Sequence, residues 1–326
     1  MALIRFDISN SSVTADFSPA SPRAGRYAGV AEADYFAAAA VNASTLKHMG
    51  RSPLHCQAAM NDPQRQDTEA QRVGRLVHCA VLEPARFAAD YCRAPDPAEH
   101  PAALLDHAAF KARARDLGLK VTGTKAELKA RILEADPEVL FWEDHAQGLV
   151  EGREALKADH WHLAQAVLAS VGGNDKARAA LTGGVAEETL VWLDGPTGLL
   201  AKARLDYYRE DLGVVFDVKT TEDARPEAVA RDILKWGYHV SAAHYLAGLE
   251  ALGLPAEQFA WIFVEKKAPF AVGLYVASAG MLDRGRELCR QYLGDFARCR
   301  LSGVWPGYPG AFQPIDLPAW AQRGSS

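Results

Sequence analysis

Apolar and polar residues follow two different spacings along the chain, helical in the first half and mostly strand-like in the second. In the first half the spacing predicts helices that begin at Ser44 and Ser52 and helices over residues 68–87, 104–117, 125–133 and 139–170. In the second half it predicts strands over 187–193, 199–208, 213–219, 259–265 and 270–276, and helices over 226–235, 239–252 and 281–299. Residues 1–35 have no clear period and are expected to form loop, with a short strand at the start. This order of elements predicts an α/β or α+β fold with a mixed sheet.

Composition narrows the class of protein only slightly. The chain has 326 residues, 49% of them hydrophobic and 24% charged, with a formal net charge of −5. These values are ordinary for a globular protein and exclude disorder as the dominant state. Mild acidity argues against coating nucleic acid through bulk charge, but it leaves a local basic patch open.

The cysteines and the hydropathy predict a cytoplasmic location. The five cysteines are scattered and form no Cys-x-x-Cys pair, so we expect free thiols in a reducing compartment and no zinc finger. No run of 18 apolar residues is present, so we expect no membrane-spanning helix and no membrane partner.

Three charged residues on two predicted strands carry the most informative pattern. Asp206 ends one strand, and Asp217 and Lys219 lie two residues apart on the next, so the side chains of the latter two share a face. The residues around them are apolar, which indicates a strand buried on both sides. Burial of such charges is costly, and a magnesium ion, which prefers carboxylate and phosphate oxygens, would explain it.

A buried ion pair, with Lys219 neutralising the two aspartates, is the alternative explanation for this pattern. Glu187, at the start of the preceding strand, could add a third carboxylate, although Glu188 stands beside it. The chain has neither the phosphate-binding loop Gly-x-x-x-x-Gly-Lys-Ser/Thr nor the dinucleotide fingerprint Gly-x-Gly-x-x-Gly, so ATP or dinucleotide use has no support.

The Glu…Asp…Asp-x-Lys arrangement resembles the core of the PD-(D/E)XK nuclease superfamily. More narrowly, several stretches resemble exonuclease VIII, the RecE-type phage recombination exonuclease, over roughly residues 40–95 and 180–280. These stretches are Ser-Pro-Leu-His at 52–55, Gly-Arg-Leu-Val-His at 74–78 with Val-Leu-Glu-Pro at 81–84, residues 198–206, Phe-Asp-Val-Lys-Thr-Thr at 216–221, and Tyr-His-Val at 238–240 continuing to Tyr245. The resemblance implies a restriction-endonuclease-like core, with a mixed central sheet flanked by helices.

The resemblance also implies roles for individual residues. Asp206, Asp217 and the backbone carbonyl of Val218 would bind Mg²⁺ or Mn²⁺, and Lys219 would position or activate the attacking water. His78 would be a metal ligand or would orient the substrate, although a histidine on an apolar helix face is often a core residue. Glu187 would be a further acidic residue, and Tyr245 would contact DNA. Ser241 stands where relatives often have Gln, and His55 and His239 fit packing or DNA contact equally well.

A basic stretch between these regions resembles a SAP motif, a small helix-extended-helix DNA-binding module. Residues 110–133 contain seven Lys or Arg and two acidic residues, a local charge of +5. The matching residues are Leu-Gly-Leu at 117–119, Thr-Gly-Thr-Lys-Ala-Glu-Leu at 122–128 and Ile-Leu at 132–133. Lys120, Lys125, Lys129 and Arg131 would contact phosphates, giving affinity without sequence choice. The alternative is a solvated basic hairpin.

Taken together, the resemblances predict three regions and one function. Residues 1–100 would form the helical part that carries His78, 101–137 the SAP-like insertion, and 138–326 the nuclease core. The expected function is a metal-dependent exonuclease acting on double-stranded DNA ends in phage-type recombination, as a homo-oligomeric ring working with a single-strand annealing protein. An endonuclease for repair or restriction, or a DNA-binding protein with a vestigial site, are the alternatives.

Overall fold

The structure is a computed structural model, and it describes residues 17–62 and 68–316. The chain forms two compact units. The first contains residues 1–67, 175–264 and 272–326, and the second contains residues 68–174 and 265–271. The strand expected at the start of the chain lies outside the described residues. The division at residues 100 and 137 remains a prediction.

The first unit is built on a six-stranded sheet. Its strands lie in the order β1 (Gly25–Tyr27), β4 (Val185–Asp194), β5 (Leu199–Arg209), β6 (Val214–Thr221), β7 (Gln258–Glu265) and β8 (Val272–Val276). The pairs β1–β4, β4–β5, β5–β6 and β7–β8 are antiparallel. Two helices connect the neighbours β6 and β7, the crossover expected for a parallel pair. The predicted α+β class, with a mixed sheet flanked by helices, is confirmed.

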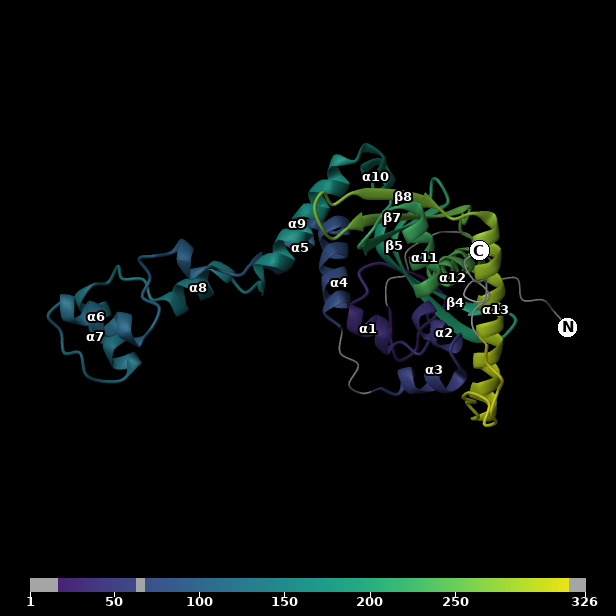
Figure 1. Cartoon of the computed structure of the whole chain (residues 1–326), viewed down its shortest axis with the longest axis horizontal. Coiled ribbons are helices and arrows are strands. Elements are labelled where there is room, and N and C mark those ends of the chain that lie inside the picture. Colours follow the sequence, from purple (N-terminus) through teal and green to yellow (C-terminus); the bar gives the residue numbers. More distant parts are fainter. Residues whose placement is uncertain (1–16, 63–67, 317–326) are drawn as a thin grey trace. The chain divides into compact units, whose positions relative to one another are not determined.

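Helices lie beside this sheet (Figure 1) and pack against it through two apolar clusters. The helices of the unit are α1 (Glu32–Ala37), α2 (Ala43–Met49), α3 (Pro53–Met60), α10 (Asp175–Ala180), α11 (Pro226–Trp236), α12 (Tyr238–Ala251) and α13 (Ala279–Ser302). One cluster joins Ile233 of α11 and Leu246 of α12 to Trp261 of β7. The other joins Leu46 of α2 to Phe296 of α13. The burial of these large side chains fixes the helices beside the strands.

The second unit is mainly helical. It contains α4 (Glu69–Leu82), α5 (Pro84–Asp90), β2 (Tyr91–Arg93), the 3₁₀ helix η1 (Pro97–Glu99), α6 (His107–Asp116), α7 (Lys125–Ala135), α8 (Trp142–Val150), β3 (Glu154–Leu156) and α9 (Ala158–Gly173). Leu76 of α4 and Ala164 of α9 share one cluster, and Phe110, Leu128 and Phe141 share another around α6 and α7. The strands β2 and β3 form a parallel pair.

Capping residues explain several helix boundaries and correct one prediction. Thr68 and Thr124 each form a capping box at the start of α4 and α7. Ser52 caps α3. The helix expected to begin at Ser44 instead begins at Ala43, because the side chain of Asn42 accepts a hydrogen bond from the backbone N–H of Thr45 at 2.8 Å.

The single helix predicted over residues 139–170 is wrong. α8 ends at Val150, and the chain then passes through Glu151 (φ 52°) and Gly152 (φ 80°) into the short strand β3 before α9 begins. Two consecutive residues in the left-handed region end a helix, and glycine adopts that conformation without the steric cost of a Cβ. Apolar spacing alone did not reveal this break.

All five cysteines are free thiols, as predicted, and all five are buried. Within residues 17–62 and 68–316, no helix is both long and apolar enough to cross a membrane.

Candidate functional site

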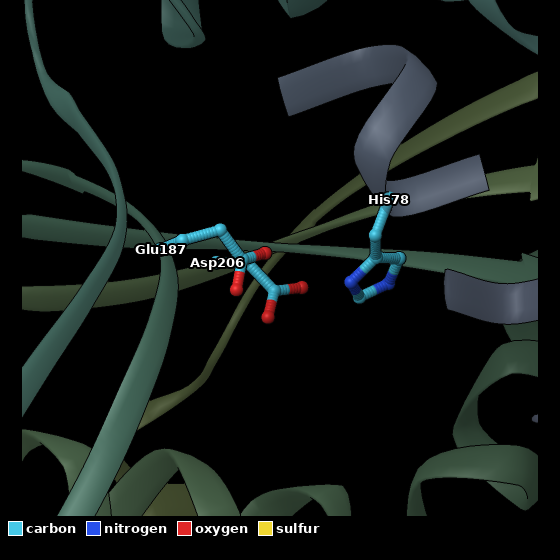
Figure 2. A group of neighbouring side chains, drawn as sticks. All are labelled: His78, Glu187 and Asp206. Carbon is cyan, nitrogen blue, oxygen red and sulfur yellow. The ribbon is translucent and has the colours of Figure 1, made fainter. Parts of the chain in front are cut away.

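Two carboxylates face each other across β4 and β5. The β4–β5 register pairs Ala186 with Tyr207 and Glu188 with Leu205, which places Glu187 opposite Asp206. Their carboxylate oxygens lie within 4.8 Å of each other, and Figure 2 shows both side chains extending from neighbouring strands. Glu187 has φ 53°, a strained conformation for a residue other than glycine. Like charges directly opposite in a sheet are destabilising, so both features indicate a functional constraint.

Asp217 and Lys219 extend this acidic group onto β6. The β5–β6 register, Tyr207↔Phe216, continued by one residue pair, sets Asp217 opposite Asp206. The Lys219 ammonium lies 2.6 Å from an Asp217 oxygen and 3.4 Å from Asp206 Oδ2. It also donates to the Val218 carbonyl at 3.3 Å. The backbone N–H of Val218 donates to Asp206 Oδ2 at 2.9 Å, which holds that carboxylate in place. The predicted Asp-Asp-Lys group is therefore brought together.

Glu188, which the sequence could not separate from Glu187, has a different environment. Its side chain is fully buried, and one oxygen accepts a hydrogen bond from Arg26 Nε at 2.8 Å. Arg26 also binds Glu210 at 2.8 Å. This ion pair connects β1 to β4 and accounts for the burial of Glu188, so the carboxylate beside Asp206 is that of Glu187.

The site holds more negative charge than Lys219 alone balances. Burial and the negative charge of Asp206 raise the pKa of the Asp217 carboxyl to about 7, although Lys219 acts in the opposite direction. Burial by itself would lower the pKa of Lys219. The negative charges of Asp206 and Asp217 outweigh this effect and raise the pKa above its ordinary value, so the ammonium stays protonated. Carboxylate and carbonyl oxygens are the donors that hard divalent cations such as Mg²⁺ and Mn²⁺ prefer. The donor set of Glu187, Asp206, Asp217 and Val218 thus suits such an ion.

The other residues of the family resemblance lie on helices. His78, also labelled in Figure 2, is half-buried on α4 of the second unit. The Tyr245 ring packs against the core of the first unit. Burial raises the pKa of its hydroxyl, and Asp217 and Asp206 raise it further, so Tyr245 lies within electrostatic range of the acidic group.

The two histidines left open by the sequence have internal partners. His55 Nδ1 lies 2.6 Å from the Ser52 hydroxyl. His239 is buried with Nδ1 3.4 Å from the carbonyl of Ile233. Ser241 is buried on α12. Packing accounts for His239.

Lys47 is a residue of this site that the sequence analysis missed. It belongs to α2, and its ammonium lies 5.3 Å from the centroid of the Tyr238 ring. Burial and the positive charge of Lys219 lower the pKa of Lys47 to about 8, while Asp217 raises it in part. A lysine beside the apolar positions Leu46 and Met49 is normally solvated, so the sequence carried no clear signal for it.

In the basic module, the SAP-like stretch of residues 110–133, two of the predicted DNA-contacting lysines form ion pairs with acidic residues of α8. Lys125 Nζ lies 2.6 Å from Glu143, and Lys129 forms an ion pair with Asp144. Arg131 donates to the backbone carbonyl of Lys120, which is itself exposed. The module closes through a bridge between Leu104 and Phe141, so these acids are held next to α7.

Comparisons with known proteins identify a family for this chain. A search of curated proteins gave no match. Among solved structures, a candidate exonuclease from Eubacterium rectale aligns with a TM-score of 0.49 and 12% identity, over 85% of this chain and 91% of that chain. Residues 42–318 match the model of the family described as PDDEXK-like domain of unknown function (DUF3799). The predicted relation to the PD-(D/E)XK superfamily is confirmed. Because the match covers most of the sequence, the chain belongs to this PDDEXK-like domain family.

Proposed function

We propose that this protein is a metal-dependent DNA exonuclease that processes double-stranded ends. The observation that carries the proposal is the group of three carboxylates, from Glu187, Asp206 and Asp217 on adjacent strands, with Lys219 bound between two of them. A buried ion pair of Lys219 with the two aspartates would need no third carboxylate beside them. Membership of the PDDEXK-like family supports phosphodiester hydrolysis as the chemistry.

Each residue of the site has a proposed role in phosphodiester hydrolysis. Glu187, Asp206, Asp217 and the carbonyl of Val218 would hold Mg²⁺ or Mn²⁺. A divalent ion bound there lowers the pKa of water and stabilises negative charge on phosphate oxygens. Lys219 keeps its positive charge beside Asp217 and can orient a water molecule or stabilise the developing charge. His78 is proposed from its motif as a further ligand or substrate-orienting group, and Tyr245 as a DNA contact near the acids.

The basic module is proposed to hold duplex DNA. Lys120, Lys125, Lys129 and Arg131 are the candidate phosphate contacts, and two of these lysines would have to exchange Glu143 or Asp144 for phosphate oxygens. The resemblance further suggests a role in phage-type recombination, with a homo-oligomeric ring and a single-strand annealing protein as partner.

A digestion assay tests the proposed function. Linear duplex labelled at either end is incubated with Mg²⁺ or with EDTA, beside a closed circular duplex. We expect Mg²⁺-dependent release of nucleotides from the linear substrate, loss of release with EDTA, and an intact circle. D217N should abolish digestion, whereas the matched variant D223N, which alters a half-buried aspartate paired with Arg225 just beyond β6, should keep it.

The alternatives give different results in the same assay. Cleavage of the closed circle would identify an endonuclease for repair or restriction. A DNA-binding protein with a vestigial site would digest neither substrate, and D217N would then change no measured property.

A further inference from the structure

Contacts of the chain segment around Lys47 position this residue near the acidic group. The backbone N–H of Val41 donates to the carbonyl of Leu200 at 2.8 Å, and the N–H of Lys202 donates to the carbonyl of Val41 at 2.8 Å. This short parallel contact joins the start of α2 to β5. Leu46 and Met49 are buried in the cluster with α13. The position of Lys47 is therefore set by backbone and core contacts on both sides of it.

The ammonium groups of Lys47 and Lys219 share one aromatic neighbour but differ in their partners. They lie 5.3 Å and 5.6 Å from the centroid of the Tyr238 ring. Lys219 is bound by carboxylates at 2.6 and 3.4 Å. Among the residues that the structure describes, the Lys47 ammonium has no hydrogen-bond acceptor and no ion-pair partner; its stem passes Gly237, where an added Cβ would lie 3.4 Å from Lys47 Cδ and Cγ. A cation without an acceptor in a half-buried position is ready to bind an anion.

The charge of the group indicates which anion fits. When all three are ionised, as they would be around a bound cation, Glu187, Asp206 and Asp217 contribute three formal negative charges, and Lys219 contributes one positive charge. A divalent ion would bring this sum to zero. Lys47 then adds one positive charge, which matches a single phosphodiester, the monoanionic repeating unit of a nucleic acid backbone.

We propose that Lys47 is a phosphate-binding residue that holds a backbone phosphodiester of the DNA at the carboxylate group. The inference rests on the proposed nuclease function and deepens it, because it assigns the substrate phosphate to a named cation separate from Lys219. The competing explanation is that Lys47 only packs its stem on Gly237 and its charge on Tyr238.

Substitutions of Lys47 separate these explanations. In K47Q we expect the affinity for duplex DNA, measured by fluorescence anisotropy in Ca²⁺ under conditions where a gel shows no cleavage, to fall roughly tenfold. The slope of log K against log salt should become shallower by about 1, the loss of one phosphate contact. K47R should restore most of the DNA affinity and of the salt slope. K47M keeps the packing stem without the charge and should restore neither. Mn²⁺ affinity measured calorimetrically without DNA should not weaken in K47Q.

K235Q is the matched control. Lys235 is exposed on α11, and its ammonium lies 4.7 Å from the Trp236 ring centroid, so it shares the cation–aromatic contact but lacks an electrostatic link to Asp217. Its DNA affinity and salt slope should equal those of the wild type.

Three outcomes would overturn the inference: an unchanged salt slope in K47Q, rescue by K47M, or an equal loss in K235Q. These outcomes differ from failure of the proposed function. If the wild type digests DNA and D217N does not, the nuclease proposal stands even when Lys47 fails its test. If the wild type neither binds nor digests DNA, the nuclease proposal itself fails.

Discussion

A buried histidine should make the first unit sensitive to acid. His244 on α12 is 1% exposed, and its Nε2 donates a hydrogen bond to the carbonyl of Lys202 at 3.1 Å. Its ring lies 4.8 Å from that of Trp192. Burial lowers the pKa of His244 from 6.5 to about 4, and the bond to Lys202 offsets only part of that shift. The neutral imidazole is therefore the folded form at neutral pH.

The sign and size of the effect follow from linkage. Because the folded pKa lies below the unfolded one, the unfolded chain binds more protons between pH 6.5 and pH 4, and stability falls as the pH falls through this window. Relative to pH 7.5, His244 should cost about 2 kcal/mol of unfolding free energy at pH 5. Acidic residues elsewhere add their own pH dependence, so the comparison must be made between variants.

Chemical denaturation followed by tryptophan fluorescence, at pH 7.5 and pH 5, measures this difference. In H244Q the amide nitrogen can donate to the same carbonyl but does not titrate. We expect H244Q to be less stable than the wild type at pH 7.5, yet to lose about 2 kcal/mol less on acidification. Equal losses in the two proteins would refute the assignment of this acid sensitivity to His244.

Three further predictions concern the site and the basic module. Neutralising α8 with E143Q and D144N should free Lys125 and Lys129 and steepen the salt dependence of DNA binding, measured by anisotropy, by up to about 2 in the log–log slope; no change would mean that these lysines do not meet phosphates. Mn²⁺ should raise the Tm of the wild type, because binding adds about 2.7 kcal/mol to the free energy of unfolding at a free Mn²⁺ concentration of 100 times the Kd. D206N should remove this rise, and equal shifts in both proteins would place the bound ion elsewhere. G237A should destabilise by roughly 1 kcal/mol in thermal unfolding, because Gly237 has φ 63° and an added Cβ would meet the Lys47 stem; wild-type stability would contradict this.

The central part of the site could be predicted because it depends on local rules. Strand alternation alone puts Asp217 and Lys219 on one face, and the hairpin before them brings Asp206 alongside. The capping boxes at Thr68 and Thr124 likewise involve residues only three positions apart, so these two helix starts depend on local sequence. These features need no knowledge of contacts between distant segments.

The remaining features depend on register or on distant contacts. Choosing Glu187 over Glu188 requires the β4–β5 register, since a shift of one residue reverses the face of every side chain. Lys47 reaches the site only because Val41 pairs with β5, more than 150 residues later in the chain. The pairing of Lys125 with Glu143 likewise depends on how the module closes.

Anomalous diffraction from crystals grown with Mn²⁺ would test the metal site most directly. We expect a peak beside the carboxylates of Glu187 and Asp206, within about 2–2.5 Å of an Asp206 oxygen, and none at that position in D206N crystals. A Mn²⁺ peak bound elsewhere, with the carboxylate group in contact with water alone at saturating metal, would contradict the assignment of these residues as a divalent cation site.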